Sequence, residues 1–253
     1  MLKFLVIFLQ KLRILSSLSI RLTQLTGKSK APVHPKHLVK FKPWFLKYLA
    51  EIDVILDIGC GNGQSTLKAA KKVKKIIGID VDDKELAKAK SEAQGLKIKN
   101  AKFLKSTAEG KLDFGDKTFD KVLFFDVLEH LENQRLALSE IWRVLKKDGI
   151  LLLSVPNKNT SWKKLQRKVN LSYFSDPDHK REYSENEIKK QLIQHEFKIL
   201  EVKPVVFDTP AAPFFDLIGG FSIALYEKIA AWKIKKAYEL PSESTGFEIV
   251  AKK

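Results

Sequence analysis

Short apolar runs alternate with amphipathic stretches between residues 52 and 160. The runs have the length and β-branched composition of buried strands: Val54–Ile58, Lys75–Asp80, Ala101–Leu104, Phe119–Phe125 and Ile150–Val155. The stretches between them predict helices: Gln64–Val73, a second one capped by Asp82 or Asp83 and running to about Gln94, and Asn133 to about Lys147. Strands that alternate with helices in this way predict an α/β fold with a doubly wound, mostly parallel sheet.

After Pro156 the pattern changes. Ser184–Glu187 is a capping box that opens a helix to about His195. Two further strands, at Phe197–Phe207 and Gly246–Ala251, bring the sheet to seven. We therefore divide the chain into an N-terminal helix and connector at 1–51 and a main domain at 52–253, with an apolar helical insertion at about 208–244.

Leucines recur at three- and four-residue steps from Leu5 to Leu25, with basic and polar residues elsewhere around the helical wheel. This pattern predicts a basic amphipathic helix, which suits a membrane surface or docking on the domain. A second helix is expected at 38–51. The insertion suits a cover over an apolar substrate, a membrane-facing surface, or burial against the N-terminal helix. The apolar run Phe4–Leu9 is too short to span a membrane, and no signal-peptide cleavage site follows it.

Composition narrows the classes of protein. The chain has 253 residues, of which 44% are apolar, and this excludes general disorder. A net charge of +16 indicates an anionic partner such as nucleic acid, acidic lipid or a phosphorylated substrate, or else a solvated lysine-rich surface. One cysteine allows no intramolecular disulfide, which is typical of a reducing compartment. No Cys/His cluster has zinc-site spacing, so no metal is predicted.

The stretch that carries chemistry begins at the first strand. Gly59, Gly61 and Gly63 follow Val54–Ile58 at alternate positions, where no side chain keeps a ligand from the backbone. The helix from Gln64 points its free N–H groups back over this turn. The sequence therefore predicts a nucleotide-type pocket. A dinucleotide fingerprint needs a gap of three between its last two glycines, so hydride-transfer cofactors are not favoured.

Polar residues also follow the other parallel strands. Asp80, Ser106–Glu109 and Asp126 all come at the carboxyl ends of predicted strands. Ligands of doubly wound sheets bind at these ends, beside the point where the strand order reverses. We expect the glycine turn and these side chains to meet at one edge of the sheet.

The series Asp57-x-Gly59-x-Gly61-x-Gly63 resembles motif I of class I S-adenosylmethionine-dependent methyltransferases. The resemblance continues through residues 52–160 in Gly78–Asp80, Thr107–Glu109, Phe125–Leu131, Arg143–Gly149 and Leu152–Asn157. The Leu128–Leu131 segment resembles the corresponding segment of a broad branch of this family, whose members methylate small molecules, quinones, lipids and sugars. The family's fold is Rossmann-like, with an antiparallel last strand.

The resemblance implies S-adenosylmethionine as the cofactor. Its binding residues would be Asp57, Gly59, Cys60, Gly61, Gly63, Asp80, Val81, Thr107, Ala108, Glu109 and Asp126. Asp57 would bind the ammonium group directly or through water, and Asp80 would accept the ribose hydroxyls. Thr107 stands where relatives often carry Asp, which leaves the adenine contact to Thr107, the Ala108 backbone or Glu109.

Methyl transfer is an in-line displacement that gains much of its rate from alignment. A general base is needed only for an acceptor that must lose a proton, and His130 and His179 are the candidates. Either histidine could instead be a solvated or capping residue.

The acceptor class follows from elimination and resemblance. Cys60 lies in the glycine turn, which argues against carbon-5 pyrimidine methylation, and the Asn-Pro-Pro-Tyr pattern of exocyclic-amine enzymes is absent. We expect O-, N- or C-methylation of a small-molecule or lipid- or glycan-linked acceptor, in the cytoplasm and peripheral on the inner membrane face, with anionic lipid as a partner. The alternatives are an RNA or protein methyltransferase and a non-catalytic cofactor-binding protein. The sequence leaves the oligomeric state open.

Overall fold

Two units make up the protein, whose computed structural model describes residues 2–12, 14–39 and 43–253. The first unit consists of Met1–Lys42, Asn157–Ser175 and Pro204–Gly246. The second consists of Pro43–Pro156, Asp176–Lys203 and Phe247–Lys253, and it holds the predicted cofactor residues. Three segments far apart in sequence thus fold together as the first unit.

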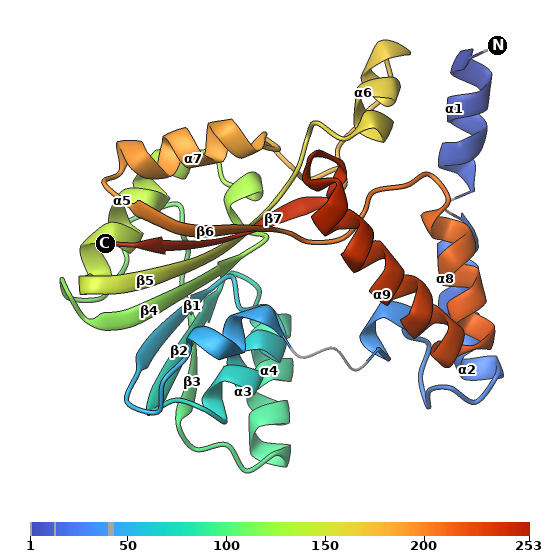
Figure 1. Cartoon of the computed structure of the whole chain (residues 1–253). Coiled ribbons are helices and arrows are strands. Elements are labelled where there is room, and N and C mark those ends of the chain that lie inside the picture. The colour runs from blue at the N-terminus through green and yellow to red at the C-terminus, as the bar shows by residue number, and fades with distance from the viewer. Residues whose placement is uncertain (1, 13, 40–42) are drawn as a thin grey trace. The chain divides into compact units, whose positions relative to one another are not determined.

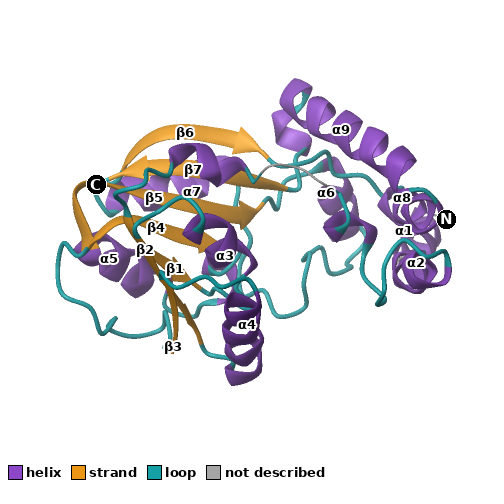
Figure 2. Cartoon of the chain, turned by 90° about the horizontal axis from the view of Figure 1, so that it is seen from below, coloured by secondary structure: helices purple, strands orange, loops and turns teal. Residues whose placement is uncertain are grey.

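A seven-stranded sheet runs through the second unit in the order β3-β2-β1-β4-β5-β7-β6 (Figure 2). Its strands are β1 (Val54–Ile58), β2 (Lys75–Asp80), β3 (Ala101–Lys105), β4 (Phe119–Phe125), β5 (Leu145–Pro156), β6 (Lys198–Pro204) and β7 (Gly246–Lys252). The pairs from β3 to β5 are parallel. β7 is antiparallel to β5, because the N–H of Lys253 donates to Gly149 O and that of Asn157 to Thr245 O. The predicted fold class is confirmed.

Helices cover both faces of the sheet (Figure 1). They are α3 (Gln64–Ala70), α4 (Asp83–Gly95), α5 (Gln134–Val144) and α7 (Glu185–Gln194). Alternate residues of β1 serve the two faces: Ile55 packs in a cluster with Ala69 of α3, whereas Leu56 shares a cluster with Leu138 of α5. Burial on both sides therefore explains why apolar residues stand at consecutive positions of the strand.

The strand order reverses beside β1. β1 pairs in parallel with β2 on one side and with β4 on the other, so its carboxyl end lies at the topological switch point. Crossover helices leave in opposite directions from such a point and open a crevice for ligands. The glycine turn occupies this position.

The boundary between α5 and β5 differs from the prediction. The helix ends at Val144, not Lys147, and the strand begins at Leu145. Leu145 is fully buried and pairs with Phe119 of β4, and the register shifts between Phe119 and Lys121. Tertiary pairing therefore overrides the helical pattern that continues to Lys147.

The N-terminal segment also differs from the prediction. Two helices, α1 (Leu2–Lys11) and α2 (Ile14–Leu25), replace the single one expected. The helix predicted at 38–51 is wrong: the described part holds 3₁₀ turns at Pro35–His37 and Trp44–Tyr48, and residues 40–42 lie outside the described residues. Pro35 and Pro43 favour such short turns.

The insertion forms α8 (Ala212–Phe221) and α9 (Ile223–Glu239), and the segment after β5 forms α6 (Ser161–Lys168). α8 packs against α2, which lies beside it in Figure 1. Small groups make this contact: an added Cβ at Gly220 would lie 2.7 Å from Leu22 Cβ, and Thr26 Oγ1 donates to Gly220 O at 2.8 Å. Ser19 and Thr23 are the buried residues of α2. Leu18 and Leu25, part of the predicted apolar face, are exposed.

Within the described residues, every helix is too short or too polar to cross a membrane.

Candidate functional site

Two glycines of the turn are packed tightly. Gly59 has φ +71°, and an added Cβ would lie 2.2 Å from Val127 Cγ2. The N–H groups of Gly59 and Cys60 both donate to Ile79 O of β2, at 2.8 and 3.0 Å. Gly63 has φ +80° and caps α3. These contacts join the turn to β2 and to the segment after β4.

Gly61 differs from its neighbours. Its φ is +49°, and no heavy atom among the described residues lies within 4 Å of an added Cβ. Its N–H donates to Asp80 Oδ2 at 2.7 Å. The turn is therefore open at Gly61, where the predicted cofactor needs to approach the backbone.

Asp57 lies beneath the turn. The hydroxyl of Thr66 donates a hydrogen bond to Asp57 Oδ2 at 2.5 Å, and Asp57 is almost fully buried. This burial raises the pKa of Asp57 to about 7. A ligand ammonium group would stabilise the carboxylate, and burial favours the water-mediated form of that predicted contact.

Cys60 is also buried, and an added Cβ at Gly78 would lie 2.9 Å from its Sγ. Burial, then the charges of Asp57 and Asp80, raise the pKa of the thiol. A thiol whose pKa is raised stays protonated and is a poor nucleophile. This agrees with the prediction that Cys60 is part of the glycine turn and not a catalytic nucleophile.

Asp80 stands at the carboxyl end of β2. Its Oδ1 accepts from the N–H of Asp82 at 2.9 Å and its Oδ2 from Gly61. Each oxygen keeps a further lone pair for a ligand hydroxyl. Asp82, not Asp80, caps α4, because its Oδ1 accepts from Lys84 N at 2.7 Å. Val81 follows with its side chain 62% exposed, an apolar surface at the same edge.

The loop after β3 holds the residues predicted to contact adenine. Thr107 Oγ1 accepts from the N–H of Glu109 at 3.0 Å. The carboxylate of Glu109 accepts from Glu132 N at 2.7 Å and Asn133 N at 3.1 Å, at the start of α5. Ala108 is half-buried against the main core. Since Glu109 already binds α5, its predicted contact with adenine is less favoured than that of Thr107 or Ala108.

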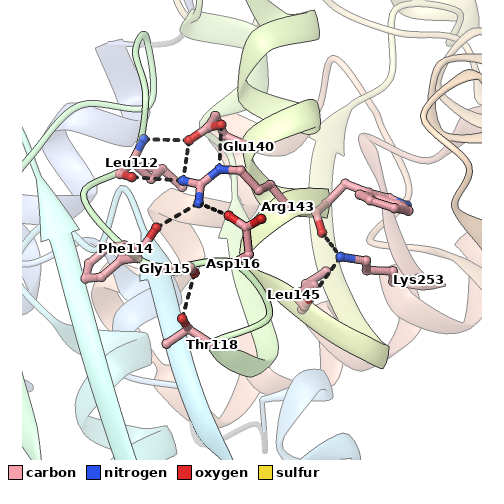
Figure 3. Close-up of polar contacts among 10 residues, drawn as sticks. Leu112, Phe114, Gly115, Asp116, Thr118, Glu140, Arg143, Leu145 and Lys253 are labelled. Carbon is pink, nitrogen blue, oxygen red and sulfur yellow. Dashed lines mark hydrogen bonds and ion pairs between the residues drawn. The ribbon is translucent and has the colours of Figure 1, made fainter.

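Arg143 holds the rest of this loop, as Figure 3 shows. Its guanidinium donates to Leu112 O at 2.9 Å, Phe114 O at 2.8 Å and Asp116 Oδ1 at 2.7 Å. It also donates twice to Glu140, at 2.8 and 2.7 Å, while Glu140 Oε2 accepts from Leu112 N at 2.7 Å. The sequence analysis missed this role, because nothing in the local pattern links Arg143 to residues about thirty positions earlier.

Asp126 follows β4 in the left-handed region, with φ +54°. Its N–H donates to Ser154 O at 3.1 Å, and its Oδ1 accepts from Ser154 Oγ at 2.8 Å. Asp adopts the left-handed region more readily than most residues, so the chain can turn here directly after the strand. Val127 next to it packs on Gly59, so Asp126 lies at the edge of the sheet that carries the glycine turn.

The two candidate bases lie side by side in the fold. The rings of His130 and His179 are 4.7 Å apart between centroids, in an edge arrangement at 80°. His130 is half-buried and His179 is buried. His179 Nδ1 lies 3.0 Å from Glu182 Oε1, so His179 is not the solvated residue of the alternative interpretation.

Comparison with known proteins agrees with this geometry. A family model described as a methyltransferase domain matches residues 51–202. YcgJ, an uncharacterized methyltransferase of Bacillus subtilis, is 32% identical over 160 residues, which are 61% of this chain and 62% of that protein. A ubiquinone biosynthesis O-methyltransferase of Bartonella bacilliformis is 28% identical over 163 residues, 61% of this chain and 63% of the relative. This chain thus spans less than two thirds of the length of either curated relative.

The solved structure of YcgJ is also similar, with a TM-score of 0.57 and 25% identity, covering 82% of this chain and 93% of that one. The match to the family model extends over more than half of the sequence and includes the glycine turn, Asp80 and Asp126. The chain therefore belongs to the class I S-adenosylmethionine-dependent methyltransferases.

Proposed function

We propose that this chain transfers a methyl group from S-adenosylmethionine to a small-molecule or lipid- or glycan-linked acceptor at an anionic membrane surface. The cofactor supplies the electrophilic methyl group. The residues fit it: Gly61 leaves the backbone open, the Asp80 oxygens have free lone pairs, and Val81 offers an exposed apolar surface for a base. Asp126 would orient substrate or cofactor beside them.

Asp80→Asn is expected to weaken cofactor binding by about 1–3 kcal/mol, the scale of a lost hydrogen bond to a charged group. The amide oxygen can still accept from Gly61 N, so the glycine turn should keep that contact, and only the hydrogen bond from Asp82 N is lost. Asp82→Asn is the matched control, because Asn caps helices as well as Asp does. Titration calorimetry with S-adenosylmethionine measures both variants. Equal affinities for the wild type and Asp80→Asn would mean that the ribose assignment is wrong.

The observation that carries the membrane half of the proposal is the charge of the N-terminal segment. Residues 1–50 contain no Asp or Glu and ten basic residues: Lys3, Lys11, Arg13, Arg21, Lys28, Lys30, Lys36, Lys40, Lys42 and Lys47. Basic residues beside a bilayer with acidic lipid contribute about 1 kcal/mol each.

Apolar side chains accompany this charge. Phe4 and Phe8 of α1 are 79% and 59% exposed, and Ile14 of α2 is 71% exposed. The buried residues of α2 are instead the small polar side chains Ser19 and Thr23. Exposed aromatic and aliphatic residues among lysines are typical of helices that lie in a membrane interface.

Full-length protein is expected to co-sediment with vesicles of mixed phosphatidylcholine and phosphatidylglycerol at low salt, and much less with phosphatidylcholine alone. Phe8→Asp should reduce the bound fraction at least tenfold, because it replaces an exposed ring that would insert into the membrane interface with a negative charge. Ile193→Asp is the control: this α7 side chain is 62% exposed on the other unit and should leave binding unchanged. Equal sedimentation of all three proteins with both vesicle types would contradict the proposal.

The acceptor class is tested by incubating cell extract with methyl-labelled cofactor and separating lipid, glycan, nucleic-acid and protein fractions. We expect label in the lipid or small-molecule fraction. Label in nucleic acid, with binding that falls steeply with salt, would favour the RNA alternative. Tight cofactor binding with no labelled fraction would indicate a non-catalytic protein.

A further inference from the structure

Glu129, His130 and His179 form a cluster outside the predicted cofactor residues. One ligand atom from each lies within 4.8 Å of the others. His179 Nε2 is 4.0 Å from Glu129 Oε1. We propose that these three side chains bind one divalent transition-metal ion of the zinc class. No metal was predicted from the sequence, because His130 and His179 are far apart along the chain.

Backbone contacts bring the ligands together. Glu129 and His130 lie in the 3₁₀ turn Leu128–His130, directly after β4. The N–H groups of Lys180 and Arg181 both donate to Glu129 O, at 2.8 and 3.2 Å. The segment with His179 is therefore held against the turn by the main chain.

A second carboxylate orients His179. Glu182 Oε1 lies 3.0 Å from His179 Nδ1, and both groups are buried, with Glu182 1% exposed. A proton on Nδ1 directed at Glu182 leaves the Nε2 lone pair facing Glu129. Metal-binding histidines usually donate their other ring N–H to a carboxylate or carbonyl in this way.

The donor set indicates the kind of metal. Two imidazoles and one carboxylate suit zinc, cobalt or nickel, whereas magnesium and calcium prefer oxygen ligands throughout. Three protein ligands leave a coordination position for water or an oxygen of a bound molecule, as in catalytic zinc sites. His130 is the partly exposed member of the cluster, whereas Glu129 and His179 are buried. His130 and His179 would then be ligands and not general bases.

The test uses full-length protein treated with a chelator and then titrated with Co²⁺, whose d–d absorption bands report coordination directly. One equivalent should produce bands of a four- or five-coordinate site, and one equivalent of Zn²⁺ should abolish them. His179→Ala should lose at least a hundredfold in affinity, and Glu182→Gln ten- to a hundredfold, as expected for a residue that orients a ligand. His195→Ala is the control, because His195 Nδ1 contacts Gln191 O and lies outside the cluster.

Zn²⁺ should also raise the melting temperature of the wild type and of His195→Ala, but not that of His179→Ala. This result does not depend on catalysis, so it stands apart from the proposed function. Absence of cobalt bands in the wild type would overturn the proposal even if methyl transfer is found. Equal affinities of His179→Ala and His195→Ala would overturn it as well.

Discussion

Gly59→Ala is expected to destabilise the folded chain by about 3 kcal/mol. The backbone there has φ +71°, which costs a residue with a Cβ about 1–2 kcal/mol. The new methyl carbon would also lie 2.2 Å from Val127 Cγ2, closer than any van der Waals contact, and such overpacking costs about 1–3 kcal/mol. Urea denaturation of the unliganded protein, followed by circular dichroism, measures the loss.

Two further variants separate the contributions. Gly61→Ala has a similar φ penalty but no clash within the described residues, so it should cost only about 1 kcal/mol of stability while it lowers cofactor affinity. Val127→Ala removes the clashing methyl groups, so the double variant should be less destabilised than the two single effects added together. Additive effects in this cycle, or equal losses for Gly59→Ala and Gly61→Ala, would show that Val127 does not limit the turn.

Arg143→Met should lower the free energy of unfolding by about 2–4 kcal/mol. The substitution leaves Glu140, whose side chain is 11% exposed, without its cation, and it leaves the carbonyls of Leu112 and Phe114 without their donor. Breaking a largely buried ion pair from one side costs more than the pair contributes, because the remaining charge stays desolvated. Urea denaturation at neutral pH measures this loss too.

Glu140→Gln combined with Arg143→Met should recover part of the stability, because the double variant buries no unpaired charge. Lys105→Met is a control for loss of a surface cation: Lys105 and Asp83 are both well exposed, and no measurable change is expected. An Arg143→Met variant as stable as Lys105→Met would mean that the network in Figure 3 does not support the loop.

The ion pair between Arg143 and Glu140 also predicts that the stability of the fold depends on pH. Hydrogen bonds from Arg143 lower the pKa of Glu140 below its ordinary 4.5. A depressed carboxyl pKa contributes stability that is present above the ordinary value and is lost as pH falls through the folded value. The free energy of unfolding of the wild type should therefore decrease as the pH is lowered below about 4.5, because Glu140 becomes protonated. Arg143→Met should lack that part of the decrease.

The sheet could be predicted from sequence because its strands are buried on both faces. Val54–Ile58 and Phe119–Phe125 both contain apolar residues at consecutive positions, Val54–Leu56 and Val122–Phe125, and the structure has both strands with the predicted bounds. Ser184 and Glu187 also form the predicted capping box of α7. Such signals are local, since a cap or a buried strand is determined by neighbours a few residues away.

The N-terminal segment shows where local signals fail. The leucine pattern predicts an apolar contact face, yet Leu18 and Leu25 are exposed, and α2 meets α8 where Leu22 and Ser19 lie against Gly220. Close approach of two helices favours small residues, and their partner lies about 200 positions away. A pattern of hydrophobicity within one helix contains no information about that partner.

The amino-acid sequence by itself determined the glycine turn, the strand-end carboxylates and hence the family. A tight turn needs glycine, and a ligand site at a strand end needs polar side chains, so each feature is recognisable from residue types within a few positions of one another. Only the tertiary structure decided that Glu109 binds the start of α5, that Arg143 holds the loop before it, and that His130 and His179 share one cluster with Glu129 and Glu182. Each of these contacts joins segments that the sheet brings together, and spacing along the chain does not encode distance in space.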